Sequence, residues 1–281
     1  MILPVELIDS VLDYVGDSFS ATEMSTTLRA CSLVCRFWRA LVQPILYARF
    51  TRYRRSYHNA ALIKSLVEHK HLQNYVKTLW VDASWFQTTD RERELLFALL
   101  PEVQELGMLQ NGYHLSGLIN YPHVFPGVVV FGNLTRLTLQ GINDFPIDLF
   151  NRFDALQDLF IRSTILVGFS PTTGEPLNSN TLTTSHPQLR LLHISINRSS
   201  DVDACSWLQH PDCVFSLSGV KTLHISDYTT WGPLNDHQKK VLGLMSCLSS
   251  SVEDLIVHPP NSEPVYPYSQ YHVGRLNFHF L

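Results

Sequence analysis

A six-residue pattern, apolar-x-x-Leu-x-apolar, in which x stands for any residue, recurs between residues 76 and 257. Its seven copies lie at 76–81, 103–108, 134–139, 156–161, 189–194, 220–225 and 252–257. Apolar side chains separated by one other residue are typical of a β-strand that buries one of its faces. A single short strand cannot enclose these side chains, so the pattern predicts that the copies stack on one another.

The spacing of the copies indicates the architecture of the stack. The central leucines are Leu79, Leu106, Leu137, Leu159, Leu192, Leu223 and Leu255. The intervals between them are 27, 31, 22, 33, 31 and 32 residues, close to and slightly above the period of leucine-rich repeats. We therefore predict an α/β fold for residues 51–281. It would be an irregular leucine-rich-repeat solenoid, with a parallel β-sheet on the concave face and helices and loops on the convex face.

Segments before and between the copies carry helix and loop signals. Residues 61–75 and 236–248 place their apolar side chains at helical spacing, and 89–92 have the pattern of a capping box before a further helix. Residues 168–184 are rich in Gly, Pro, Ser, Thr and Asn, which predicts a loop.

Parallel stacking would arrange the outward side chains of the strands in rows, with neighbours about 4.8 Å apart. The row before the central leucines contains Thr78, Glu105, Arg136, Asp158, Leu191, Thr222 and Asp254. The row after them contains Trp80, Gly107, Thr138, Phe160, His193, His224 and Ile256. We predict that Phe160, His193, His224 and Ile256, flanked by Arg162, form a binding strip for another protein. The alternative is that a loop or helix of the chain covers these positions.

The first fifty residues follow a helical pattern instead. Apolar residues recur on one helical face at Leu3, Leu7, Ile8, Val11, Leu12 and Val15. A polar linker is expected at 16–27, a second helix from Leu28 through Trp38, and a third short helix that Pro44 opens. Three short helices cannot enclose this many apolar side chains, so we expect a partner or a following domain to cover them.

The motif Leu3-Pro4-x-Glu6-Leu7-Ile8, followed by Leu28-x-x-Cys31-x-x-Val34-Cys35-Arg36-x-Trp38, resembles the F-box, especially in the form found in large fungal families. The resemblance covers about residues 2–48. It implies a three-helix F-box domain at 1–50 that docks onto the Skp adaptor and, through it, a cullin scaffold. Position by position, it implies contact or supporting roles for Leu3, Pro4, Leu7, Ile8, Val34, Cys35 and Trp38.

The resemblance implies that the chain is the substrate receptor of an SCF-type ubiquitin ligase, with a protein substrate of unknown identity bound by the repeats. An alternative is a leucine-rich-repeat interaction scaffold without a ligase role, in which the leading helices only cap the solenoid. A third class, a nucleic-acid binder, would use the arginines Arg49, Arg52, Arg54 and Arg55.

Composition and charge reduce the number of partner classes and cellular compartments that we expect for this chain. The formal net charge of −4 gives no general attraction for phosphate backbones, so we expect no nucleic-acid partner. Glu6 and Asp9 lie where a secretory signal would be basic or apolar, and no apolar run is long enough to span a membrane, so we expect neither a signal peptide nor a membrane partner. The five cysteines form no dense disulfide framework, which suits reduced thiols in the cytoplasm or nucleus.

Motifs that carry catalysis are not found in the sequence. It contains no glycine-rich phosphate loop, nucleophile elbow or dinucleotide fingerprint, so we expect neither an enzyme nor a cofactor. The pair Cys31 and Cys35 and the group Cys205, His210 and Cys213 have too few ligands at suitable spacing to predict a metal site.

Overall fold

The computed structural model describes residues 21–51, 66–82, 99–109, 132–142, 145–162, 187–195, 199–210, 213–226 and 236–257, together with positions 10, 11, 14, 64, 164, 166 and 167. The descriptions below concern these residues.

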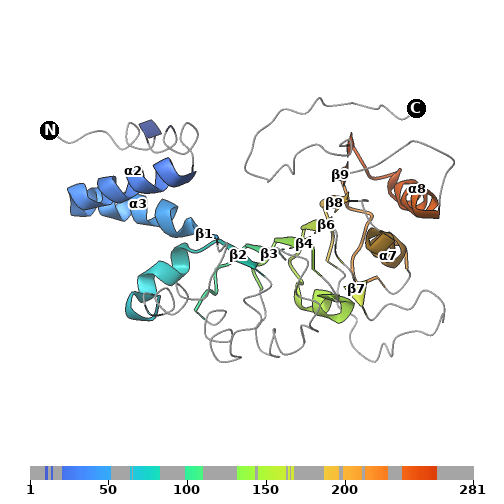
Figure 1. The fold of residues 1–281 in the computed structure, drawn as a ribbon, viewed down its shortest axis with the longest axis horizontal. Coiled ribbons are helices and arrows are strands. Elements are labelled where there is room, and N and C mark those ends of the chain that lie inside the picture. The colour runs from blue at the N-terminus through green and yellow to red at the C-terminus, as the bar shows by residue number, and fades with distance from the viewer. Residues whose placement is uncertain are drawn as a thin grey trace.

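The described chain forms an open, entirely parallel eight-stranded sheet of order β1-β2-β3-β4-β6-β8-β9-β10 (Figure 1). Its strands are β1 (Arg49–Thr51), β2 (Thr78–Asp82), β3 (Glu105–Leu109), β4 (Arg136–Gln140), β6 (Asp158–Arg162), β8 (Leu191–Ser195), β9 (Thr222–Ser226) and β10 (Asp254–Val257). A second, two-stranded parallel sheet pairs β5 (Phe145–Pro146) with β7 (Leu166–Val167). The predicted α/β class is confirmed, and β1 is a strand that the repeated pattern did not predict.

The predicted register of the seven strands is also confirmed. The central leucines pair from strand to strand, as with Leu79 and Leu106 or Leu192 and Leu223. The two outward rows pair in the predicted order as well. All copies of the motif have the same length, so their leucines can pair in one register along the sheet. A slip of one residue would turn every buried leucine of a strand toward the opposite face.

A repeated backbone contact fastens each strand to the next one. The carbonyl group before one strand accepts two hydrogen bonds from successive N–H groups of the following copy. Gln104 and Glu105, for example, both donate to the oxygen of Lys77, at 2.8 and 3.0 Å. The same arrangement recurs at the carbonyl groups of Gln104, Thr135, Gln157, Arg190 and Lys221. The main chain therefore supplies hydrogen bonds that hold neighbouring copies together. The stacking requires little of the side chains between the motifs.

Helices and short 3-10 turns lie on the convex side of the curved sheet (Figure 1). They are η1 (Lys70–Tyr75), η3 (Ile147–Arg152), α7 (Ser199–Leu208) and α8 (Asp236–Leu248), and α7 packs against α8. The core between these elements and the sheet includes an aromatic cluster in which Phe150 stacks on Trp207, with ring centroids 4.8 Å apart, and meets Phe215 edge-on at 5.2 Å. All three side chains are buried.

Predictions for the connecting segments had mixed outcomes. The helix at 236–248 is confirmed as α8, whereas the helix predicted over 61–75 ends in the 3-10 turn η1. Helix α7 was missed because Ser199–Leu208 has only a weak apolar stripe, and it owes its stability to burial of Ala204, Trp207 and Leu208. The capping box at 89–92 and the loop at 168–184 lie outside the described residues.

The N-terminal helices differ in extent from the prediction. Helix α2 spans Ala21–Val34 and α3 spans Arg36–Ala48. Most of the expected linker at 16–27 is therefore helical from residue 21, where Glu23 in the first turn favourably meets the helix dipole. The helical conformation is interrupted at Cys35. The second helix therefore ends before Trp38, which belongs to α3.

Pro44 does not open a helix, contrary to the prediction, but lies inside α3. Its ring removes one backbone donor, a cost of about 3 kcal/mol in a helix interior. Packing offsets this cost, because Val42 of α3 and Leu28 of α2 form a small buried core with Trp38 and Leu41 against them. Tertiary contact between the two helices thus overrides the local preference of proline.

The N-terminal helices α2 and α3 join the sheet without an intervening linker. Helix α3 contacts η1 and runs directly into β1, which pairs with β2 at one edge of the sheet. The N–H of Lys77 donates to the carbonyl oxygen of Ala48 at 2.9 Å. The predicted domain boundary between residues 50 and 51 thus falls inside β1.

Candidate functional site

The strip predicted from the sequence, Phe160, His193, His224 and Ile256, lies on four successive strands of the sheet. The four residues are direct register partners on β6, β8, β9 and β10. The ring centroids of Phe160 and His193 are 5.6 Å apart, and those of His193 and His224 are 5.3 Å apart. We name these four residues the concave strip.

The burial of outward positions divides this face of the sheet into two parts. Most outward side chains on β2, β3 and β4 are buried, among them Trp80, Glu105 and Thr138, whereas Arg136 is half-buried. Those on β6 to β10, including all four residues of the concave strip, are half-buried. The described residues therefore leave the later strands as the accessible part of the face. The four residues of the concave strip are thus partly accessible, and the alternative that a loop or helix of the chain covers these positions stays a prediction.

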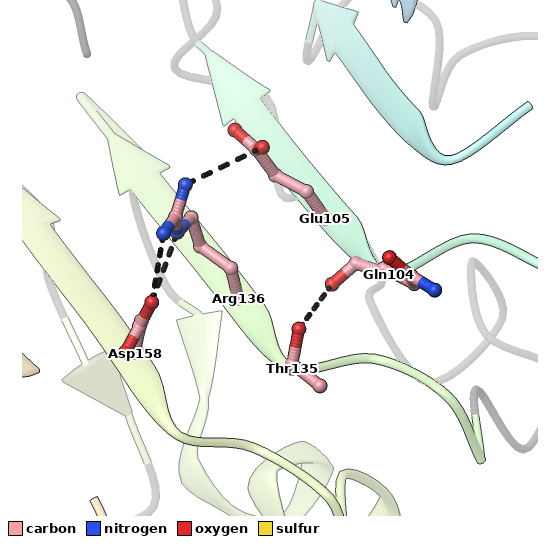
Figure 2. Close-up of polar contacts among 5 residues, drawn as sticks. All are labelled: Gln104, Glu105, Thr135, Arg136 and Asp158. Carbon is pink, nitrogen blue, oxygen red and sulfur yellow. Dashed lines mark hydrogen bonds and ion pairs between the residues drawn. The ribbon is translucent and has the colours of Figure 1, made fainter. Parts of the chain in front are cut away.

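A cluster of charged side chains adjoins the strip. Arg136 on β4 donates from Nε and Nη2 to one carboxylate oxygen of Asp158 on β6, at 3.1 and 2.9 Å (Figure 2). Its Nη1 lies 3.7 Å from a carboxylate oxygen of Glu105 on β3. The guanidinium carbon also lies 5.9 Å from the ring centroid of Phe160. We name Glu105, Arg136 and Asp158 the charge cluster; its guanidinium group lies near the Phe160 ring as well as the two carboxylates.

Polar contacts also hold the other side of the strip. Nε2 of His193 lies 3.1 Å from the hydroxyl oxygen of Ser226 on β9. Arg162, two residues beyond Phe160 on β6, is half-buried and accepts a hydrogen bond at its carbonyl oxygen from Thr164 Oγ1 at 3.1 Å. Rings held by such neighbours lose little side-chain freedom when a partner covers them, which favours binding.

A second candidate surface lies on the helices α2 and α3. Among the residues predicted to contact an adaptor, Val34 is 70% exposed and Cys35 is exposed, while Trp38 is half-buried against the small Leu28–Val42 core. Leu3, Pro4, Leu7 and Ile8 lie outside the described residues. The structure therefore separates the described members of the set into an exposed pair and a supporting tryptophan.

Exposed apolar residues beyond the predicted set extend this surface. Leu33 is 78% exposed and Phe37 is 47% exposed, and Ile45 is also exposed. The sequence contained a signal for the first two, because Leu33 and Phe37 are four positions apart and fall outside the periodic face that starts at Leu28. We name Leu33, Val34, Phe37 and Ile45 the apolar helix surface.

The remaining chemical groups are less suggestive of a site. Within the described ranges, no group of three or more His, Cys, Asp or Glu side chains is arranged to hold a metal ion. Burial raises the pKa of the Cys213 thiol to about 11, although a hydrogen bond with the backbone of Phe215 opposes the shift. A thiol with a raised pKa is a poor nucleophile and a poor metal ligand at neutral pH.

The described residues include one of the four arginines considered for nucleic-acid binding. The backbone of Arg49 belongs to β1, but Arg52, Arg54 and Arg55 lie outside the described residues. None of the described helices combines the length and apolar character needed to cross a membrane.

Comparison with known proteins gives no family assignment: no protein-family model matches the sequence, and no curated protein is significantly similar to it.

Proposed function

We propose that this protein is the substrate-receptor subunit of an SCF-type cullin-RING ubiquitin ligase, with an F-box at 1–50 and leucine-rich repeats behind it. The observation that carries the proposal is the apolar helix surface, which projects from one edge of the sheet and keeps Leu33, Val34 and Phe37 exposed. Several large exposed apolar side chains within residues 33–37 favour a protein-binding role for these helices. The resemblance of residues 2–48 to the F-box favours the Skp adaptor as the partner.

The repeats supply the second half of the proposal. Sequential parallel strands, with the described helices and 3-10 turns on the convex side, support the irregular leucine-rich-repeat architecture expected from the motif spacing. In this proposal the chain performs no chemistry. It raises the effective concentration of a substrate lysine beside a charged conjugating enzyme by binding adaptor and substrate at the same time.

Co-expression with a Skp adaptor tests the first half. The wild-type chain is expected to co-purify with the adaptor in a stoichiometric complex. Val34→Asp, which places a charge on the apolar helix surface without touching the Leu28–Val42 core, is expected to abolish the complex. The matched control is Leu242→Asp on α8, where another exposed apolar residue lies far along the chain. Equal adaptor binding by both variants would refute the proposed surface.

Substrate capture tests the second half. The double variant Phe160→Ala/His193→Ala removes the centre of the concave strip and is expected to abolish capture of the cognate substrate while adaptor binding persists. Unchanged capture would contradict the assignment of the strip.

The alternative function, an interaction scaffold whose helices cap the repeats, has one observation in its favour. Helix α3 leads into β1, which covers the edge of β2 that would otherwise be unpaired. This role requires no adaptor, so the absence of any complex in the co-expression experiment would favour it.

A further inference from the structure

We propose that residues 273–278 of the same chain dock in parallel on the outer edge of β10 and form a further strand of the main sheet. Strand β10 is the last strand of that sheet, and within the described residues only its edge toward β9 is paired. The edge of a strand offers N–H and C=O groups to a further strand. The proposal concerns the repeats alone and does not depend on the ligase function.

The inward side chains of β10 give the first argument. In the six preceding copies of the motif, the central leucine is at most 2% exposed, whereas Leu255 is half-buried. The last apolar position of those copies is at most 4% exposed, whereas Val257 is 39% exposed. Each copy in such a stack buries its apolar side chains against its neighbours. In the part of the chain that the structure describes, β10 therefore lacks a neighbour on its outer side.

The sequence after β10 contains a matching copy of the motif. Residues 258–281 lie outside the described residues. Within them, 273–278 read Val-Gly-Arg-Leu-Asn-Phe, the same apolar-x-x-Leu-x-apolar pattern as the other seven copies. Leu276 follows Leu255 by 21 residues, close to the 22 residues between two earlier central leucines. All prolines after β10 precede this copy, so each of its residues has a backbone N–H to donate.

The chain between β10 and this copy is long enough for a crossover. In each of the seven other copies the strand starts at the third motif position, so the further strand is expected to start at Arg275. The connection, residues 258–274, is then as long as residues 141–157, which join β4 to β6. A connection between parallel strands needs about a dozen residues or more, so this length is sufficient.

The repeated backbone contact predicts how the strand is fastened. Glu253 and Asp254 both donate to the carbonyl oxygen of Lys221, at 2.8 and 3.0 Å. At the same positions one copy further along, the donors are Gly274 and Arg275, and the acceptor is the carbonyl group of Glu253. The further strand therefore continues the hydrogen-bonding pattern that holds the preceding strands together.

This register decides which side chains of the copy become buried. Leu276 lies beside Leu255 and covers the inward face of β10, as the central leucines do on the preceding strands. Asn277 lies beside Ile256 in the outward row and extends the concave strip by one polar residue. Because side chains alternate between the two faces of a strand, position 276 is sensitive to a charged substitution and position 277 is not.

Hydrogen exchange followed by mass spectrometry on the purified full-length chain tests the docking. Amides of 275–279 are expected to exchange about a hundredfold more slowly than in an unstructured peptide, at every protein concentration. Leu276→Asp should remove this protection and accelerate exchange in β10. The control Asn277→Asp adds the same charge at the outward position and should leave both segments protected.

Three outcomes of this experiment would overturn the proposal. The first is exchange of the wild-type segment at the unstructured rate, and the second is equal exchange in Leu276→Asp and Asn277→Asp. The third is protection that grows with protein concentration, because a second copy of the chain would then supply the strand.

Paired cysteines test the register. Ile256→Cys combined with Asn277→Cys places two Cα atoms about 4.8 Å apart, within the range for a disulfide. Mild oxidation is expected to link them within one molecule, as measured by peptide mapping with mass spectrometry. In the control, Ile256→Cys with Phe278→Cys, the second thiol belongs to the opposite face and should form no such bond. Equal yields from both pairs, or no bond in the first, would contradict the parallel register.

Discussion

The indole ring of Trp80 on β2 lies over Gly107, its register partner on β3. A Cβ atom at position 107 would overlap the six-membered part of that ring, with Cε2 only 2.7 Å away. The absence of a side chain at Gly107 thus gives the buried tryptophan its place on the concave face. It also explains why a glycine occupies the interior of a strand, where it is otherwise unfavourable.

Replacement of Gly107 by alanine is expected to lower the free energy of unfolding by about 1–3 kcal/mol, because the indole must move within packed surroundings. Gly132→Ala is the matched control, since nothing lies within 4 Å of the Cβ that it would add. Urea denaturation of both variants measures the difference. A Gly107→Ala protein as stable as Gly132→Ala would show that the tryptophan does not require the glycine.

The aromatic cluster on the convex side predicts a larger loss. Phe150→Ala should destabilise the protein by about 3–5 kcal/mol, because a buried ring is replaced by a cavity between Trp207 and Phe215. Phe37→Ala should cost much less, about 0.5–1 kcal/mol, since that residue is 47% exposed. Thermal unfolding followed by circular dichroism provides the comparison, and similar losses in the two variants would contradict it.

Burial, rather than distance, should decide how much each ion pair contributes to the free energy of unfolding. Lys221 and Glu253 are 2.6 Å apart but both exposed, so Lys221→Met should change the free energy of unfolding by less than about 0.5 kcal/mol. Arg136→Met should cost about 1–3 kcal/mol, because it leaves Glu105 and Asp158 without their shared cation. Chemical denaturation at one fixed salt concentration compares the two variants. A larger loss of unfolding free energy for Lys221→Met than for Arg136→Met would contradict this expectation.

The cysteines should differ in reactivity. Cys35 and Cys247 are exposed and should be alkylated in the native protein, whereas the buried Cys205 and Cys213 should be protected until denaturant is added. Mass spectrometry after timed alkylation measures this directly. Rapid native labelling of Cys213 would show that its surroundings open.

The raised pKa of Cys213 also predicts a dependence of stability on pH. Because the folded-state pKa of about 11 exceeds the usual value of 9.0, the stabilising effect of the buried neutral thiol is complete below pH 9 and is lost as pH rises toward 11. The decline in the urea midpoint between pH 8.5 and 10.5 should therefore be smaller in Cys213→Ala than in the wild type. Parallel declines would show that this thiol does not contribute.

The repeated motif was sufficient to predict seven of the eight strands of the main sheet, their parallel order and their register. The reason is that strand patterning is local and each copy has the same length. The same reasoning places Phe160, His193 and His224 on adjacent strands. It missed β1, because Arg49–Thr51 lacks the motif and pairs only because α3 delivers it to the edge of β2.

The sequence by itself therefore determined the strands, their register and the identity of the residues in each outward row. Only the tertiary structure decided which of these outward residues remain accessible, that Arg136 is shared by Glu105 and Asp158, and that Pro44 is accommodated inside α3. The physical reason is that alternation along a strand depends on neighbours in the chain, whereas burial, ion pairing and tolerance of a helix-breaking residue depend on segments that meet only after folding.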